Sequence, residues 1–114
     1  MKEKDYDKVI VVDFDNTLAY TDNGIPFALP NQPLIDKLNK LRDNGYLIEI
    51  FTARGTISCE NDIGVRVNTF YDMIHDWLIK HEVKFDKLSF NKPLARYYID
   101  DKAITPEDFL DERI

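Results

Sequence analysis

The sequence predicts a single α/β domain built on a Rossmann-like parallel sheet. Four consecutive apolar residues at 9–12 have the pattern of a strand buried on both faces, as strands of parallel sheets are. Further strand-like runs alternate along the chain with apolar residues at helical spacing. Strands that alternate with helices favour a parallel sheet with helices on both faces, for which we expect the strand order 3-2-1-4.

Length and composition are those of one globular domain, and we expect a single domain over residues 1–114. The lone Cys59 has no partner for an intramolecular disulfide, which favours a reducing compartment. No apolar run approaches the roughly 18 residues that cross a bilayer, and no signal segment is evident, so we expect a cytoplasmic protein without membrane contact. A net charge of −6 argues against a broad nucleic-acid-binding surface, but not against action on one strand end.

The first half of the chain has the pattern of a βαβ unit. An Asn-Gly pair at 23–24 predicts a hairpin-like excursion within residues 19–30. Asn31 can cap a helix that has Pro33 in its first turn and ends at Asn44-Gly45. Residues 46–51 then form the expected second strand.

The second half contains a loop, a longer helix and two short strands. The polar segment 55–64 has no periodicity and is expected to be a loop. The stripe of the following helix comprises Val67, Phe70, Tyr71, Ile74, Trp77 and Leu78. Residues 85–90 and 97–99 are the expected third and fourth strands, and Thr105-Pro106 begins a short terminal helix.

Polar residues follow several of these strands. Asp13 and Asp15 are two residues apart, so in extended backbone both would face one side and repel each other unless a proton or a cation lies between them. Mg²⁺ prefers such oxygen ligands. Thr52 ends the second strand, and Asp100-Asp101 ends the fourth. Each residue alone is explained by a turn or a solvated surface, but parallel strands bring their carboxyl ends to one edge, where ligands bind.

These residues carry a resemblance to a known family. The run Asp13-Phe14-Asp15-Asn16-Thr17 resembles the first motif of the haloacid dehalogenase (HAD) superfamily of phosphatases. Thr52 resembles the second motif, Lys92 the third, and Ile99-Asp100-Asp101 the fourth. The motifs keep the order of the family and span residues 9–101.

The resemblance implies a phosphomonoester hydrolase. Asp13 would attack phosphorus to form an aspartyl-phosphate, and Asp15 would act as general acid and then as general base. Thr52 and Lys92 would hold the oxygens of the transferred phosphoryl group.

The resemblance also implies Mg²⁺ as cofactor. The ion would be held by Asp13, the backbone carbonyl of Asp15, and Asp100, with Asp101 binding directly or through water. Asn16 stands where the superfamily usually has Gly. Because Asn tolerates left-handed backbone angles better than most residues, we expect the turn to survive.

The spacing of the motifs is that of the small members without a cap domain, because neither interval holds a cap. Thr17 and Arg54 are the implied substrate contacts, and the turn at 52–55 is similar to the phosphatase part of bacteriophage polynucleotide kinases. Arg66 and Arg96 have less support. The expected substrates are a nucleotide, a sugar phosphate or a nucleic-acid 3′ phosphate, selected by the loops at 19–30 and 55–64. An open site suits a large substrate or a second subunit, so a homo-oligomer is also considered.

Two alternatives remain open from the sequence. A receiver-like phospho-accepting domain has similar length and chemistry, but it would place adjacent acids after its first strand and an Asp at the end of a middle strand. Here the strands after the first end in Thr52, Asn91 and Asp100. An inactive HAD-like protein that only binds phosphate has the same residues as an active one.

Overall fold

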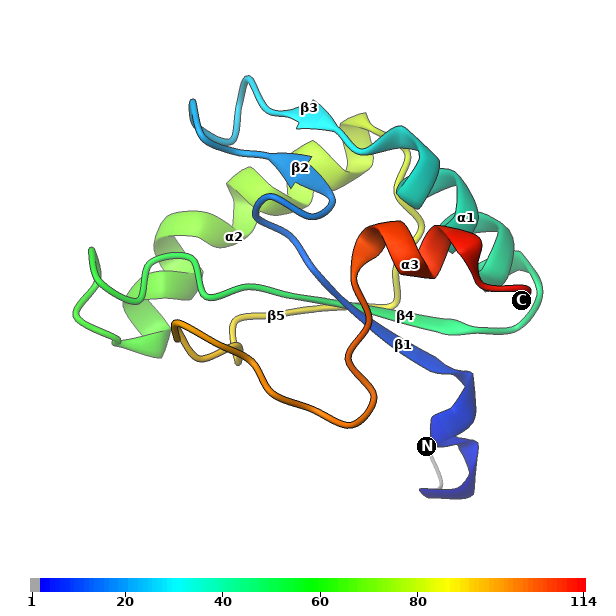
Figure 1. Cartoon of the computed structure of the whole chain (residues 1–114). Coiled ribbons are helices and arrows are strands. Elements are labelled where there is room, and N and C mark those ends of the chain that lie inside the picture. Colours follow the sequence, from blue (N-terminus) through cyan, green and yellow to red (C-terminus); the bar gives the residue numbers. More distant parts are fainter. Residues whose placement is uncertain (1–2) are drawn as a thin grey trace.

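A three-stranded parallel sheet lies at the centre of the fold (Figure 1). The computed structural model describes residues 3–114. Its elements in chain order are the 3-10 helix η1 (Glu3–Lys8), β1 (Val9–Asp13), β2 (Ala19–Tyr20), β3 (Leu29–Pro30), α1 (Gln32–Asp43), β4 (Leu47–Phe51), α2 (Ile63–Lys80), β5 (Lys87–Ser89) and α3 (Pro106–Asp111).

The strands of the sheet follow the order β1-β4-β5, with β4 in the middle. In the register, Asp13 of β1 lies opposite Phe51 of β4, and Phe51 lies opposite Ser89 of β5. Both pairings are parallel, so the residues that follow the three strands meet at one edge of the sheet. The α/β class is confirmed, as is the order of the first three expected strands.

Helix α1 begins and ends where the sequence predicts. The Asn31 side chain accepts a hydrogen bond from the backbone N–H of Leu34, and Gly45 follows the helix with a φ of +99°. The apolar stripe of α1 is buried against the sheet and comprises Leu34, Ile35, Leu38 and Leu41.

Helix α2 is rotated slightly from the expected orientation. Ile74, Trp77 and Leu78 are buried as predicted, but Val67 and Tyr71 are each 37% exposed. Arg66 takes the buried place one residue earlier. The stripe predicted from apolar residues alone therefore missed a buried guanidinium.

The excursion at 19–30 forms a small antiparallel hairpin, β2-β3, as expected. Trp77 of α2 connects it to the core, because its Nε1 donates to the carbonyl of Ala28 at 3.0 Å. The Trp77 ring also meets Phe14 edge-on, with 5.3 Å between centroids. This contact fixes the chain that leaves β1, where the first predicted site residues lie.

The expected fourth strand is not formed. The segment 97–99 has no strand partner, and Tyr97 and Ile99 are 71% and 97% exposed. The Tyr98 hydroxyl instead donates to the carbonyl of Pro93 at 2.6 Å, which closes a local loop. An apolar run of this length depends on pairing with another strand, and here the free edge of β1 does not supply it. Position 4 of the order 3-2-1-4 is therefore empty in this structure.

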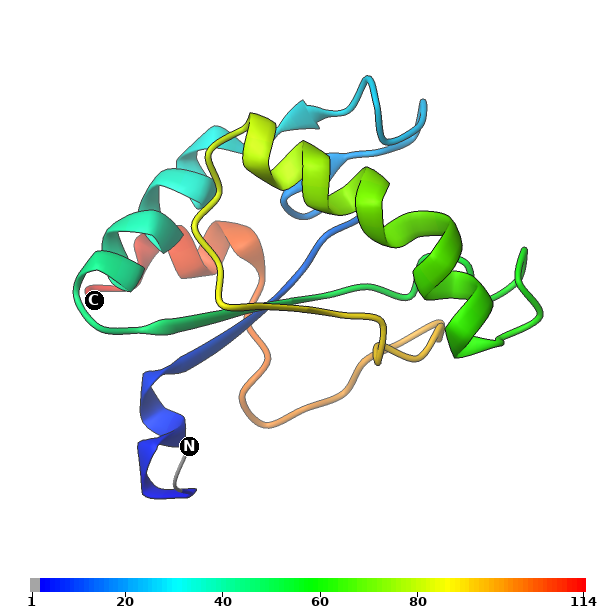
Figure 2. The ribbon, with the colours of Figure 1, turned by 180° about the vertical axis from the view of Figure 1, so that it is seen from behind.

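One face of the sheet is covered better than the other. Figures 1 and 2 show α1 and α2 on one face, whereas the segment after β5 runs across the other. This segment takes the place of the expected second helical layer, and Val11 of β1 is consequently 51% exposed rather than buried. No helix within residues 3–114 combines the length and apolar character needed to cross a membrane.

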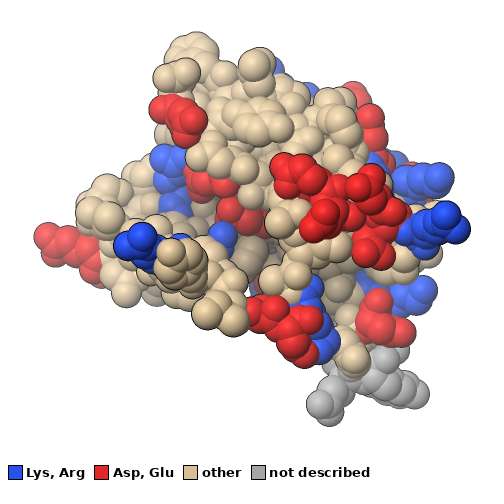
Figure 3. Space-filling view, in the orientation of Figure 1, with Lys and Arg blue, Asp and Glu red and all other residues tan. Residues whose placement is uncertain are grey.

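Acidic side chains are unevenly spread over the surface. Figure 3 shows a red cluster over α3, whose acidic residues are Glu107, Asp108 and Asp111. Helix α3 begins at Thr105, whose side chain accepts from the N–H of Asp108, and acids in a first turn suit the positive end of the helix dipole. These acids therefore have a structural reason for their position.

Candidate active site

A tight turn at the end of β1 presents Asp13 and Asp15. Asn16 has a φ of +55°, and its N–H donates to the carbonyl of Ala19 at 2.7 Å. Its side chain stabilises the turn further by accepting from the N–H of Thr21 at 3.1 Å. The left-handed geometry expected of Asn16 is confirmed.

Asp13 lies in a partly buried, cationic environment. Its Oδ2 is 3.2 Å from Nζ of Lys92 and accepts a hydrogen bond from Oγ1 of Thr17 at 3.3 Å. Burial raises the pKa of the Asp13 carboxyl above its usual value, and the ammonium of Lys92 opposes this shift only in part. A cation at this position would favour the ionised form.

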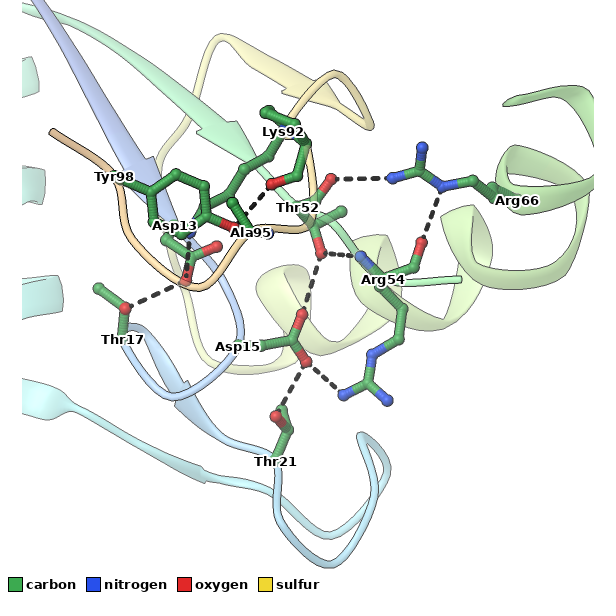
Figure 4. Close-up of polar contacts among 11 residues, drawn as sticks. Asp13, Asp15, Thr17, Thr21, Thr52, Arg54, Arg66, Lys92, Ala95 and Tyr98 are labelled. Carbon is green, nitrogen blue, oxygen red and sulfur yellow. Dashed lines mark hydrogen bonds and ion pairs between the residues drawn. The ribbon is translucent and has the colours of Figure 1, made fainter. Parts of the chain in front are cut away.

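Both oxygens of Asp15 are hydrogen-bonded (Figure 4). Oδ2 accepts from Oγ1 of Thr52 at 3.0 Å, and Oδ1 accepts from Oγ1 of Thr21 at 2.9 Å. The guanidinium of Arg54 forms an ion pair with the same Oδ1. Asp15 is therefore held in one orientation by three side chains from two segments, the hairpin and the turn after β4.

The turn after β4 is fixed from both sides. Thr52 is fully buried, and its Oγ1 also accepts from the N–H of Arg54 at 2.9 Å. From the helix side, Arg66 donates through Nε to the carbonyl of Arg54 at 3.1 Å and through Nη2 to the carbonyl of Thr52 at 3.3 Å. These bonds set the position of the two residues that contact Asp15.

Lys92 reaches Asp13 from beneath an aromatic side chain. Its Nζ lies 4.3 Å from the centroid of the Tyr98 ring and 5.2 Å from that of Phe51. The Tyr98 hydroxyl accepts from the N–H of Ala95 at 3.2 Å, so the loop after β5 is closed over the lysine. The side chain of Lys92 is only 13% exposed as a result.

These residues border a hollow of about 530 Å³ at the edge of the sheet. Its lining comprises Asp13, Asp15, Ala53, Arg54, Gly55, Thr56, Ile57, Ser58, Phe70, Lys92, Leu94 and Tyr98. The loop at 55–64 thus contributes lining residues, whereas the hairpin at 19–30 contributes Thr21 through its bond to Asp15. A hollow that combines two carboxylates with two cations can hold an anion beside a potential nucleophile.

The structure brings six of the eight predicted site residues together and leaves Asp100 and Asp101 apart. Both aspartates are exposed in a turn, where Asp101 pairs with Lys102 at 3.0 Å and that neighbour lowers the pKa of its carboxyl. Within residues 3–114, no three His, Cys, Asp or Glu side chains are grouped as a metal site. Asp100 and Asp101 are separate from the other site residues because the fourth strand is missing. Their assignment as metal ligands stays a prediction.

The chemistry at the end of β1 fits Mg²⁺ in part. The carboxylate of Asp13 is an oxygen donor of the kind that this ion prefers, and because burial raises its pKa, a bound cation would favour the ionised form. Lys92 and Arg54 balance the two carboxylates in this structure.

Sequence reasoning missed two residues that build this site and gave a third little support. Thr21 is 7% exposed and bonds Asp15, but nothing in its local sequence marks it, because the hairpin alone brings it back. Tyr98 was expected in a strand. Arg66 was a secondary candidate, and its place four residues before Phe70, on the same side of the helix, was the available indication of burial.

No family model matches the chain, and no curated protein matches it significantly. Among solved structures, a structural-genomics target from Vibrio cholerae is 31% identical, with a TM-score of 0.85, over 93% of this chain and 89% of that one. The chain is also similar to part of the Pnkp1/Rnl/Hen1 complex, with 22% identity, a TM-score of 0.55 and coverage of 91% of this chain and 33% of that one.

A third similar structure is D,D-heptose 1.7-bisphosphate phosphatase from B. bronchiseptica, complexed with magnesium and phosphate. It is 14% identical, with a TM-score of 0.50, over 83% of this chain and 53% of that one. At these identities the last two likenesses concern the fold, which is HAD-like as predicted.

Proposed function

We propose that this chain, which belongs to one family with the Vibrio cholerae protein and has the HAD-like fold, is a magnesium-dependent phosphomonoester hydrolase. The observation that carries the proposal is the convergence of Asp13, Asp15, Arg54 and Lys92 on one hollow. Similarity in fold to a phosphatase that was crystallised with magnesium and phosphate supports the same chemistry.

The proposed reaction proceeds in two displacements. Asp13 attacks phosphorus and the ester P–O bond breaks, while Asp15, which must first exchange its ion pair with Arg54 for a proton, gives that proton to the departing oxygen. Water then attacks the aspartyl-phosphate and loses its proton to Asp15, which releases phosphate and regenerates Asp13. Lys92 and Arg54 offset the negative charge on the transferred group throughout.

Three threonine residues have positioning roles in this scheme. Thr52 and Thr21 hold the Asp15 carboxyl, and Thr17 holds Asp13. Thr52 was expected to contact the phosphoryl oxygens, and its full burial favours an action through Asp15 in this conformation. Thr17 and Arg54 remain the proposed substrate contacts.

The proposed metal ligands at the end of β1 are the Asp13 carboxylate and the backbone carbonyl of Asp15. When bound, Mg²⁺ would polarise the phosphoryl group and offset its charge. Asp100 and Asp101 are proposed as further ligands, direct or through water, and Mg²⁺ titrations of Asp100→Asn and Asp101→Asn would show which of them weakens binding.

The open hollow suits a substrate larger than a simple phosphate ester. Nucleotides, sugar phosphates and nucleic-acid 3′ phosphates are the proposed classes.

Self-association is proposed too, since the hairpin exposes Phe27 and Leu29 by 84% and 71%, and sedimentation analysis would detect it.

The decisive experiment is hydrolysis of p-nitrophenyl phosphate, with and without Mg²⁺, by the wild type, Asp13→Asn and Asp43→Asn. Asp43 pairs with Lys84 on the surface, so its variant is a matched control for loss of one charge. We expect Mg²⁺-dependent turnover that disappears in Asp13→Asn alone. Unchanged turnover in Asp13→Asn would exclude this mechanism, and phosphate binding without turnover of any ester would favour the non-catalytic alternative.

A further inference from the structure

A second hollow adjoins the proposed active site and is built around Arg66. Its volume is about 500 Å³. Thr56, Lys92 and Leu94 border both hollows, so the two are continuous along one side of the sheet edge. The other residues that line it are Asn61, Ile63, Arg66, Phe90, Asn91 and Pro93.

Arg66 carries a buried charge without a counter-ion. The residue is 4% exposed, and its guanidinium makes no salt bridge with any acidic residue of the described chain. By contrast, Lys92 and Arg54, which are more exposed, each have an aspartate partner. Burying a charge without a counter-ion costs free energy of folding, so such an arrangement is unusual in proteins.

The hydrogen bonds of Arg66 leave part of its donor capacity unused, and Figure 4 shows those to the carbonyls of Thr52 and Arg54. Its acceptors are neutral: the carbonyls of Thr52 and Arg54, and Oδ1 of Asn61 at 3.4 Å from Nη1. A guanidinium has five N–H groups, so one N–H on each terminal nitrogen has no acceptor among the described residues. One free N–H on each terminal nitrogen is the donor set that an end-on bidentate contact with an oxyanion uses.

The rest of the lining suits an anion as well. No acidic residue of the described chain borders this hollow, whereas Asn61 and Asn91 offer amide groups. Ile63 begins the 18-residue helix α2, so the positive end of its dipole lies at the same place. Asp62 caps that helix by accepting from the N–H of Val65, and it does not line the hollow.

We propose that the hollow at Arg66 binds a second anionic group of the substrate, so that the preferred substrates carry two phosphates or a phosphate and another oxyanion. The reactive phosphoryl group would lie at Asp13 and Lys92, and the second anion would lie at Arg66 and Asn91. This inference about substrate class rests on the proposed function, but the anion site itself can be tested without turnover.

Direct binding is tested by titrating inorganic phosphate and following the arginine Nε–H signals by ¹⁵N NMR. The Arg66 Nε–H is buried and hydrogen-bonded, so it exchanges slowly and is observable, and Arg66→Lys assigns it. We expect a saturable shift whose apparent Kd rises about tenfold in Asn91→Asp, because the new carboxylate competes for the guanidinium. Asn68→Asp, an exposed change of the same kind on α2, is the control and should leave the Kd unaltered.

Turnover is tested with monophosphates and bisphosphates of alkanediols of increasing length. A symmetrical bisphosphate has two equivalent reactive ends, so its kcat/KM is first divided by two. We expect the corrected kcat/KM of at least one bisphosphate to be about tenfold or more above that of the monophosphate of the same alkanediol. Asn91→Asp should abolish this preference, measured as the ratio of the two kcat/KM values, whereas Asn68→Asp should keep it.

The outcomes separate the two proposals. Monophosphate turnover without any bisphosphate preference would overturn the second anion site and leave the hydrolase intact. A phosphate-dependent Arg66 shift without turnover would support the anion site and refute the hydrolase. Two results would overturn the anion site: an Arg66 Nε–H signal that does not shift when phosphate is added, or an apparent Kd for phosphate that is the same in Asn91→Asp as in the wild type.

Discussion

The charge on Asp13 links the site to the stability of the fold. Because burial raises its pKa in the folded state, the folded chain favours the protonated acid more than the unfolded chain does. The resulting stabilisation is fully present below the pKa that Asp13 has in the unfolded chain. It is lost as the pH rises through the higher pKa that Asp13 has in the folded chain. At neutral pH, ionised Asp13 therefore costs stability.

From this sign we predict that Asp13→Asn raises the free energy of unfolding at pH 7 in chelator-treated protein. The gain should shrink as the pH falls toward the ordinary carboxyl pKa of 3.8, where wild-type Asp13 is itself neutral. Urea unfolding at several pH values measures it. Asp43→Asn should show no such gain, and a less stable Asp13→Asn at pH 7 would contradict the prediction.

Thr52 gives a second prediction at the scale of single residues. Thr52→Val keeps the shape of the side chain but removes the donor to Asp15 and the acceptor of the Arg54 N–H. We expect a loss of about 1–3 kcal/mol in the free energy of unfolding, because polar partners lose their hydrogen bonds. Phosphatase kcat should fall as well, since Asp15 loses one of its supports.

The matched control is Thr52→Ser, which keeps the hydroxyl and loses one methyl group. It should lose only about 1 kcal/mol and retain activity. Denaturant unfolding and steady-state kinetics on both variants distinguish the hydroxyl from the methyl. Equal losses in the two variants would mean that packing, and not the bond to Asp15, explains the burial of this residue.

At the scale of elements, the junction between the β4 turn and α2 is tightly packed. Gly55 has a φ of +85°, and an added Cβ would lie 2.9 Å from the Phe70 ring and 3.1 Å from the Arg66 side chain. Gly45 has a similar φ of +99°, but a Cβ added there would meet no atom within 4 Å. The two glycines separate backbone strain from crowding.

We predict that Gly45→Ala costs about 1–2 kcal/mol from backbone strain alone. Gly55→Ala should cost about 1–3 kcal/mol more, because Phe70 and Arg66 must move. It should also lower kcat/KM, since Arg66 positions the turn that contains Thr52 and Arg54. Thermal unfolding of both variants measures the difference, and equal losses would show that the junction adapts freely.

The elements differ in how far the sequence could predict them. Helix α1 and strand β4 were predictable because caps, Gly45 and apolar periodicity all act locally. The segment 97–99 has the composition of a strand, but its pairing depends on a distant edge, and in this structure it lies exposed. Short strands are stabilised by partners, which local sequence does not reveal.

The same distinction applies to the site. Asp13, Thr52 and Lys92 were predictable because strand ends and motif order mark them. Thr21 and Arg66 were not, since their roles arise from a hairpin and a helix that fold back onto the sheet edge.

For the whole molecule, cation binding at the β1 end should stabilise the fold. The proposed Mg²⁺ site includes Asp13, whose pKa is raised by burial and only in part lowered by Lys92, so a bound cation would favour its ionised form. A ligand that binds only the folded chain stabilises it by about 1.4 kcal/mol at ten times its Kd. The chain contains one tryptophan, Trp77, which is 4% exposed and reports unfolding by fluorescence.

We therefore predict that Mg²⁺ raises the unfolding midpoint of the wild type but not that of Asp13→Asn. NaCl at equal ionic strength is the control, because a chain of net charge −6 gains some stability from screening alone. If Asp100 or Asp101 completes the site, Asp100→Asn or Asp101→Asn should need more Mg²⁺ for the same shift. If Mg²⁺ shifts the unfolding midpoint equally in the wild type and the three variants, the ion binds elsewhere. If NaCl gives the same shift as Mg²⁺, the stabilisation is explained by charge screening.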